Sequence, residues 1–133
     1  APRGVAAAGP NPRTLLCVDD TPANLRLMAE LVATEPGWRL LSASSPEQGI
    51  ELARTQHPDL VLLDIRMPGL DGYAVLQALR ADAGLAGVPV IAVSASAMPV
   101  DIARGRAAGF DDYLTKPLDL QRLRIVIDRL LAR

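Results

Sequence analysis

Five polar side chains in this sequence stand directly after, or close after, short apolar runs. They are three carboxylates, one hydroxyl and one ammonium: Asp19, Asp20, Asp64, Ser94 and Lys116. The carboxyl ends of parallel strands meet at one edge of a sheet, and open α/β folds bind their ligands there. If the apolar runs are parallel strands, these five side chains share one crevice.

Such a set of side chains favours a magnesium site that handles a phosphoryl group. Carboxylates within a few ångströms repel one another, and a divalent cation relieves the repulsion. Mg²⁺ prefers oxygen ligands, whereas zinc needs a cluster of His and Cys ligands, and the chain has one residue of each kind. A metal ion, a lysine and a hydroxyl together hold the oxygens of a transferring phosphoryl group.

The acceptor in such a reaction would be a side chain, because the sequence contains no glycine-rich loop that could cradle a nucleotide phosphate. A carboxylate can be that nucleophile and form an aspartyl phosphate. Taken singly, each residue also has a plain structural interpretation. Asp64 could end a strand and cap a turn, and Lys116 could be an ordinary exposed lysine.

The strand that carries Asp64 is the clearest element of the sequence. Residues 60–63 are large and apolar without alternation, which is typical of a strand buried on both faces of a parallel sheet. Pro68 and Gly69 then favour a turn, since proline fixes φ and glycine frees it. Asp64 is therefore expected at the carboxyl end of a buried strand.

Strands and helices alternate five times along the chain. We expect strands at 14–18, 38–43, 60–64, 88–93 and 112–114, and helices at 22–35, 46–55, 72–81, 99–108 and from 120 onward, with Thr21, Ser45 and Asp119 as helix caps. Strict alternation predicts an α/β fold with helices on both faces of a parallel sheet. The flavodoxin-like (βα)5 doubly wound sheet with strand order 2-1-3-4-5 is the expected topology.

The composition is typical of one globular domain. The chain has 133 residues, half of them hydrophobic, and a net charge of −1, which gives no reason to expect nucleic acid or an anionic membrane as a partner. The single Cys17 lies in an apolar run and fits a reducing compartment. We therefore expect a cytoplasmic domain, even if its parent protein is anchored in a membrane.

The first residues differ in character from the rest. Residues 1–13 are rich in Ala, Gly and Pro and show no periodic pattern, which is typical of a linker or an expression remnant. We therefore expect the folded domain at 14–133, as part of a longer protein.

Several motifs, in this order and spacing, resemble the receiver domain of bacterial two-component response regulators. They are Asp19-Asp20, the run DIRMPGLDG at 64–72, Ser94-Ala95 and YLTKP at 113–117. The resemblance covers nearly everything after Arg13. It implies a phosphoacceptor domain that catalyses its own phosphorylation and dephosphorylation.

The resemblance also implies how the acidic residues are used. Asp64 would accept the phosphoryl group. Mg²⁺ would be bound by Asp20, Asp64 and the backbone carbonyl of Arg66, with Asp19 acting mostly through water. Lys116 would pair with the phosphate.

Further residues of the resemblance concern switching and rate. Ser94 would be the switch hydroxyl and Tyr113 the switch aromatic, and a cis bond would join Lys116 to Pro117. From their positions two residues beyond Asp64 and Ser94, we also expect Arg66 and Ser96 to flank the phosphoryl group and to tune its lifetime. Phosphorylation would repack the face formed by the helix at 99–108, the strand at 112–114 and the last helix.

The segment 94–113 is most similar to receivers attached to hybrid sensor histidine kinases. The leading linker and the end of the chain at its last helix agree with such an attachment. The implied partner is a histidine kinase core or a histidine phosphotransfer domain that carries the donor histidine. We expect the isolated domain to be a monomer.

Four other interpretations stay open. The chain could be a stand-alone response regulator, or a degenerate receiver that only binds partners. A haloacid-dehalogenase-like phosphatase also uses an Asp nucleophile at a strand end, but it needs a second Asp two residues later, where this chain has Arg66. A flavodoxin-like FMN carrier needs a first loop rich in hydroxyls and amides, whereas Asp19-Asp20 would repel phosphate.

Overall fold

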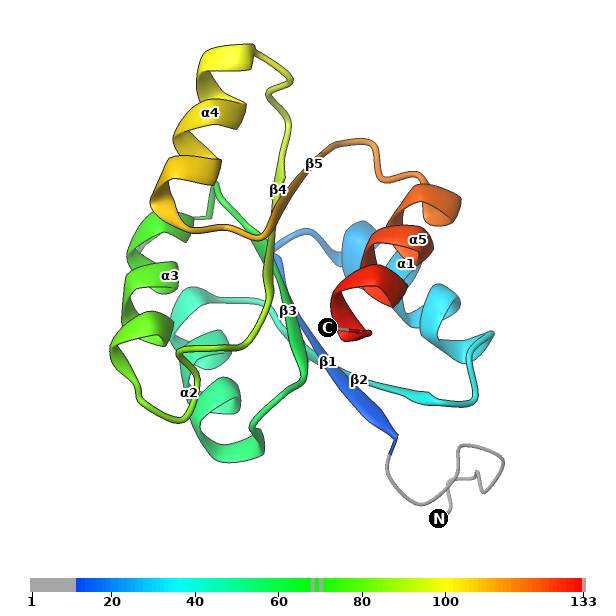
Figure 1. Ribbon diagram of the computed structural model, residues 1–133. Helices are drawn as coiled ribbons and strands as arrows, with labels where there is room; N and C mark the ends of the chain where they lie inside the picture. The colour runs from blue at the N-terminus through cyan, green and yellow to red at the C-terminus, as the bar shows by residue number, and fades with distance from the viewer. Residues whose placement is uncertain (1–11, 68, 70, 133) are drawn as a thin grey trace.

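A computed structural model describes residues 12–67, 69 and 71–132 of the protein. Its parallel sheet has five strands in the order β2-β1-β3-β4-β5, which confirms the expected fold class and topology. The elements, shown in Figure 1, are β1 (Arg13–Val18), α1 (Pro22–Ala33), β2 (Trp38–Ala43), α2 (Pro46–Gln56), β3 (Leu60–Asp64), α3 (Gly72–Ala81), β4 (Val90–Ser94), α4 (Pro99–Ala108), β5 (Asp112–Thr115) and α5 (Leu120–Leu131). Residues 1–11 of the expected linker, and Pro68 of the expected turn, lie outside the described residues.

The helices cover the sheet from both sides, as Figure 1 shows. α1 and α5 pack on one face and α2, α3 and α4 on the other, and each face has its own core of buried side chains. Strand β3 contributes side chains to both cores: Leu60 and Leu62 pack on the α1–α5 side, whereas Val61 and Leu63 pack on the other side. This two-sided burial explains why the apolar residues of β3 do not alternate with polar ones.

Three strands have boundaries that differ by one or two residues from those expected, and β4, which ends at Ser94 rather than at residue 93, differs at both ends. β1 begins at Arg13, whose N–H donates to Gly37 O at 2.8 Å, so the sheet reaches into the expected linker. β4 begins at Val90 rather than at residue 88, because proline at the preceding position has no N–H to give the ladder. β5 runs one residue further than expected, to Thr115.

Two of the three helix caps that the sequence predicts make side-chain capping hydrogen bonds. Ser45 accepts from Gln48 N at 3.2 Å, and Asp119 accepts from Gln121 N at 2.9 Å. Thr21 is different: it occupies the cap position of α1, but its side chain makes no capping hydrogen bond. Thr21 thus occupies the cap position that the sequence predicts, but its backbone carbonyl, rather than its hydroxyl, accepts from Asn24 N at 3.0 Å.

Gly105 lies inside α4, where glycine is less favourable than alanine by about 1 kcal/mol. The neighbouring strand explains why this position is glycine, because a Cβ built at Gly105 would lie 2.8 Å from Cδ2 of Tyr113. The sequence pattern alone indicated a weak helix. The structure shows that the glycine makes room for an aromatic ring.

Gly72, the first residue of α3, makes the tightest backbone approach near the carboxyl edge of the sheet. A Cβ there would lie 2.6 Å from Ile65 Cα and 3.2 Å from Asp64 O. Gly72 N also donates to Ile65 O at 2.8 Å, which ties the start of α3 to the end of β3. A side chain at this position therefore pushes directly on the backbone that follows Asp64.

We predict that Gly72→Ala lowers the free energy of unfolding by about 1–3 kcal/mol, the usual cost of overpacking against rigid backbone. Urea denaturation of both proteins measures the change. Gly37→Ala is the matched control, because no heavy atom lies within 4 Å of its Cβ position. Equal losses in the two variants would contradict the packing argument.

Candidate functional site

Three carboxylates meet at the carboxyl edge of the sheet. Oxygens of Asp19, Asp20 and Asp64 all lie within 4.8 Å of one another. Asp19 and Asp64 are each 3% exposed, whereas Asp20 is open to solvent. The adjacent parallel strands β1 and β3 bring the three residues together, as the sequence predicts.

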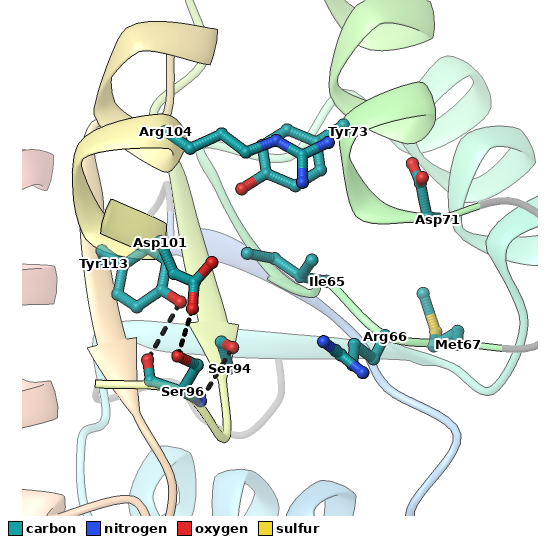
Figure 2. Close-up of a pocket in the computed structure, with 10 residues that line it drawn as sticks. All are labelled: Ile65, Arg66, Met67, Asp71, Tyr73, Ser94, Ser96, Asp101, Arg104 and Tyr113. Carbon is teal, nitrogen blue, oxygen red and sulfur yellow. Dashed lines mark hydrogen bonds between the residues drawn. The ribbon is translucent and has the colours of Figure 1, made fainter. Parts of the chain in front are cut away.

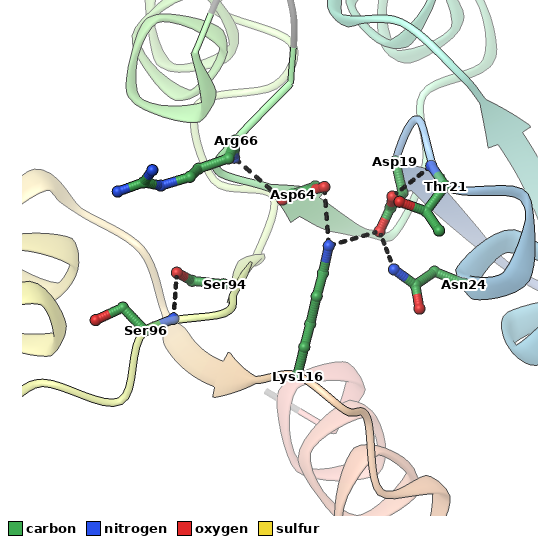
Figure 3. A network of polar contacts seen from close by, with 8 residues as sticks. All are labelled: Asp19, Thr21, Asn24, Asp64, Arg66, Ser94, Ser96 and Lys116. Atoms are coloured by element: carbon green, nitrogen blue, oxygen red, sulfur yellow. Dashed lines mark hydrogen bonds and ion pairs between the residues drawn. The ribbon is translucent and has the colours of Figure 1, made fainter.

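Lys116 reaches this acidic cluster from the loop after β5, as Figure 3 shows. Its Nζ donates to Asp64 Oδ2 at 3.0 Å and lies 3.7 Å from Asp19 Oδ2. The backbone of Lys116 is held as well, because its N–H donates to Ser94 O at 2.8 Å. The Lys116–Pro117 peptide bond is cis, which is the geometry that the resemblance implies.

Asp19 is fixed by the start of α1. Its Oδ1 accepts from Thr21 N at 2.8 Å and its Oδ2 accepts from Asn24 Nδ2 at 3.0 Å (Figure 3). The sequence reasoning did not single out Asn24. The sequence indicates Asn24 only as a polar residue in the first turn of a helix that begins two residues after Asp19-Asp20.

The two oxygens of Asp64 have different partners. Oδ1 accepts from Arg66 N at 3.0 Å, and Oδ2 accepts from Lys116. Burial raises the pKa of Asp64 and the nearby Asp19 charge raises it further, against the opposing effect of Lys116 and of the Arg66 N–H. Burial lowers the pKa of Lys116, but Asp64 and Asp19 outweigh this and raise it overall.

Ser94 ends β4 beside Asp64. It is 4% exposed, and its Oγ accepts from Ser96 N at 3.1 Å (Figure 3). In the part of the chain that the structure describes, no hydrogen bond joins the Ser94 hydroxyl to Asp64. The structure thus puts Ser94 at the same sheet edge as Asp64, but not in direct contact with it.

An open cavity of about 540 Å³ adjoins this edge, between the loop after β3 and helix α4. Its lining, drawn in Figure 2, includes the two residues expected to tune the phosphoryl lifetime, Arg66 and Ser96. The Arg66 side chain is exposed, whereas the Ser96 hydroxyl is already engaged with Asp101 Oδ2 at 2.5 Å. Sequence reasoning missed Asp101, since the contact depends on the path of a loop.

Tyr113 projects from β5 into the protein. The residue is 6% exposed, and its hydroxyl donates to Ser96 O at 3.0 Å (Figure 2). Tyr73 lies on the other side of the cavity, where its ring packs edge-on against Phe110 and carries the Arg104 guanidinium 4.3 Å from its centre. Tyr113 therefore occupies an inward position that couples β5 to the loop after β4.

Helix length and hydropathy bear on membrane attachment. Within residues 12–67, 69 and 71–132, no helix is long and apolar enough to cross a membrane.

Known proteins share both the sequence and the geometry. Protein PilH from Pseudomonas aeruginosa is 37% identical over 118 residues, which cover 89% of this chain and 97% of PilH. The polar-differentiation response regulator DivK from Brucella abortus is 36% identical and covers 83% of this chain and 89% of its own. The transcriptional regulatory protein AfsQ1 from Streptomyces coelicolor is 37% identical, but this chain spans only 52% of its length.

Solved structures agree with these relatives. A response regulator from Chloroflexus aurantiacus superposes with a TM-score of 0.82 and 32% identity, over 92% of this chain and all of that one. The receiver domain of the sensor histidine kinase PA1611 from Pseudomonas aeruginosa superposes with a TM-score of 0.83 and 30% identity, over 92% and 99% of the two chains. That structure has a magnesium ion coordinated in its active site cleft.

A comparison with protein families matches residues 15–128 to the response regulator receiver domain. The match spans all of the sheet except the first two residues of β1, and it includes the acidic cluster and Lys116. The chain therefore belongs to the response regulator receiver family, and it is a phosphoacceptor domain.

Proposed function

We propose that Asp64 is the residue that accepts the phosphoryl group, from a phosphohistidine donor and with the help of Mg²⁺. The observation that carries the proposal is the environment of Asp64. Its carboxylate is buried beside two other acids, and both of its oxygens are already held, by Arg66 N and by Lys116 Nζ. An ordinary strand-ending aspartate needs none of these contacts.

The residues present fit a magnesium ion. Their donor set consists of hard carboxylate oxygens close together, with Asp20 open to solvent so that a bound ion can keep several waters. Asp20, Asp64 and the Arg66 carbonyl would hold the ion, and Asp19 would act mostly through water. When bound, Mg²⁺ supplies positive charge that offsets the negative charge of the phosphoryl oxygens.

The chain's own residues do the rest of the reaction. One carboxylate oxygen of Asp64 forms a bond to phosphorus while the bond from phosphorus to the donor nitrogen breaks, and the donor leaves with that electron pair. Lys116 offsets charge on the phosphoryl group, since its ammonium already lies 3.0 Å from Asp64. The Ser94 hydroxyl, on the neighbouring strand, would donate to a phosphoryl oxygen.

Arg66 and Ser96 would tune how long the phosphoryl group survives. Both residues line the cavity beside Asp64, where an attacking water would approach. The exposed Arg66 side chain can screen that water directly. The hydroxyl of Ser96 is engaged with Asp101, which limits Ser96 to an influence through its backbone.

A hybrid sensor histidine kinase is the setting that we propose for this receiver. The resemblance of segment 94–113 supports it, and so does the likeness to the receiver of sensor histidine kinase PA1611. The alternative is a stand-alone regulator, supported by the coverage of PilH and DivK almost from end to end. In either setting the partner would be a histidine kinase core or a histidine phosphotransfer domain, acting on a monomeric receiver.

We expect acetyl phosphate to add one phosphate to the protein when Mg²⁺ is present and none when EDTA replaces it. Intact-mass spectrometry measures the addition of about 80 Da. Asp64→Asn should stay unmodified because an amide is not a nucleophile at neutral pH. A phosphate retained by that variant would assign the acceptor role to another residue.

Asp20→Asn should weaken Mg²⁺ binding at least about tenfold, since it replaces a charged ligand by a neutral one. NMR titration with Mg²⁺ measures the affinity. Asp128→Asn, at an exposed position near the end of α5, removes the same charge away from the site and serves as the control. Equal affinity in the Asp20 variant and the control would remove Asp20 from the metal site.

Asp64→Asn should stabilise the metal-free protein at pH 7, because it removes one of three crowded charges, and its amide oxygen can still accept one of the two hydrogen bonds that Asp64 accepts. The folded-state pKa of Asp64 is raised, so its ionisation destabilises the fold as pH rises from about 4 through that pKa. Urea denaturation in EDTA should therefore show a larger gain at pH 7 than near pH 3.5. Saturating Mg²⁺ should reduce the gain, and a gain that ignores both pH and Mg²⁺ would contradict this account.

Phosphotransfer tests the proposed setting. A phosphorylated histidine kinase core from the same parent protein should transfer its label to this receiver at least about tenfold faster than an unrelated kinase core does. The Asp64→Asn variant, which lacks the proposed acceptor carboxylate, is the negative control for the transfer. No preference for the parent core, with Asp64 still reactive to acetyl phosphate, would favour a stand-alone regulator.

A further inference from the structure

Ser96, in the loop between β4 and α4, joins three parts of the structure. Its N–H donates to Ser94 Oγ at 3.1 Å, at the end of β4. Its hydroxyl donates to Asp101 Oδ2 on α4 at 2.5 Å, and its carbonyl accepts from Tyr113 on β5 at 3.0 Å (Figure 2). The position of this one residue therefore affects both Ser94 and Tyr113.

We infer that Asp101 and Gly105, on successive turns of α4, are positioning residues that hold Tyr113 inward and orient Ser94 toward the phosphoryl site. Asp101 acts by fixing Ser96, and Gly105 acts by leaving space for the Tyr113 ring. The effect on Tyr113 stands on the contacts alone, whereas the effect on phosphorylation rests on the proposed function of Asp64.

The Ser96 hydroxyl is fully committed by its contact with Asp101. A serine hydroxyl has one hydrogen to donate, and here it goes to the Asp101 carboxylate, while Oγ accepts from Met98 N at 3.3 Å. Hydrogen bonds to an ionised carboxylate are stronger than neutral ones, and a carboxylate in the first turn of a helix is favoured there. Asp101 thus anchors the loop to α4.

The Tyr113 ring fills the space left free at Gly105. A Cβ at Gly105 would lie 2.8 Å from Cδ2 of the ring and 3.2 Å from Cε2. Both atoms belong to an aromatic ring that is itself buried and tied to Ser96 O, so the ring has little freedom to yield. A methyl group at position 105 therefore competes with the inward ring for the same volume.

Ser94 is oriented by the same loop. Its Oγ accepts the Ser96 N–H, which leaves the Ser94 hydrogen to point elsewhere. Within the described residues no acceptor takes that hydrogen, so it remains available for a phosphoryl oxygen on Asp64. Release of Ser96 would remove the contact that aims the Ser94 hydroxyl.

The position of Tyr113 can be measured directly, because the chain contains only two tyrosines. Ring signals of ¹³C-labelled tyrosine are assigned with Tyr73→Phe. Asp101→Ala and Gly105→Ala should both move the Tyr113 signals toward those of an exposed ring, while Asp101→Asn, which keeps a hydrogen-bond acceptor, should stay close to wild type. Unchanged Tyr113 signals in folded Asp101→Ala would overturn the role of Asp101, and unchanged signals in Gly105→Ala would overturn that of Gly105.

The rate of phosphorylation by acetyl phosphate gives the second measurement. Asp101→Ala should slow it by about fivefold, the equivalent of one hydrogen bond, and Asp101→Asn should restore most of the rate. Loss of the Asp101 charge alone would change the rate equally in both variants, so equal rates would overturn positioning. Ser96→Ala combined with Asp101→Ala should be no slower than the slower single variant, because both remove the same contact.

The two measurements separate the two proposals. If the wild-type protein takes no phosphate, the proposed function fails while the Tyr113 signals still test the positioning role. If Asp101→Ala does not fold, as judged by urea denaturation, Ser96→Ala breaks the same hydrogen bond from the other side and must move the Tyr113 signals for the inference to stand.

Discussion

The crowding of three carboxylates at one sheet edge is the constraint on which the rest of the site depends. Two of them, Asp19 and Asp64, are almost fully buried, and buried charges are unfavourable unless they are paired. Asp19 accepts hydrogen bonds from the start of α1, and Asp64 accepts hydrogen bonds from the loops after β3 and β5. The hydrogen bonds that stabilise the buried charges therefore also connect the elements that form the crevice.

That arrangement leaves the site short of positive charge. Lys116 is the one ammonium in direct contact with the cluster among the described residues, and it faces two buried carboxylates. The pKa of Asp64 is raised, mainly because its carboxylate is buried and also because the negative charge of Asp19 lies nearby. The contacts with Lys116 and the Arg66 N–H do not fully offset these two effects. A bound cation relieves this shortage, so the same crowding that weakens the fold favours metal binding.

The parts of this design that depend on regular structure could be predicted from the sequence. A two-sided apolar run predicts β3, and parallel strands then bring Asp19, Asp20 and Asp64 to one edge whatever the loops do. Strand ends shifted by a residue or two, because local partners such as Pro89 decide them. The overall topology was unaffected by these shifts.

The contacts made by loops could not be predicted in the same way. The bond from Ser96 to Asp101 depends on how the four residues 95–98 turn from β4 into α4, and the pattern of residue types does not encode that path. Gly105 shows the opposite case. The sequence shows a glycine inside a helix, but the reason for it is the ring of Tyr113, whose Cδ2 would lie 2.8 Å from a Cβ at position 105 and which belongs to a strand later in the chain.

Helix α4 is the element on which these unpredicted contacts converge, and its packing explains why. Gly105 is the one buried residue of α4, whereas α5 buries five. Besides Ile102, which packs on the core, polar contacts help to hold α4, including that of Asp101 with Ser96 and that of Arg106 with Asp112 at 3.7 Å. The free energy needed to open or displace an element is lowest for elements that make few buried apolar contacts. If Asp64 is phosphorylated as we propose, we expect the added charge to act on α4 through Ser94 and Ser96, because little buried apolar surface holds this helix in place.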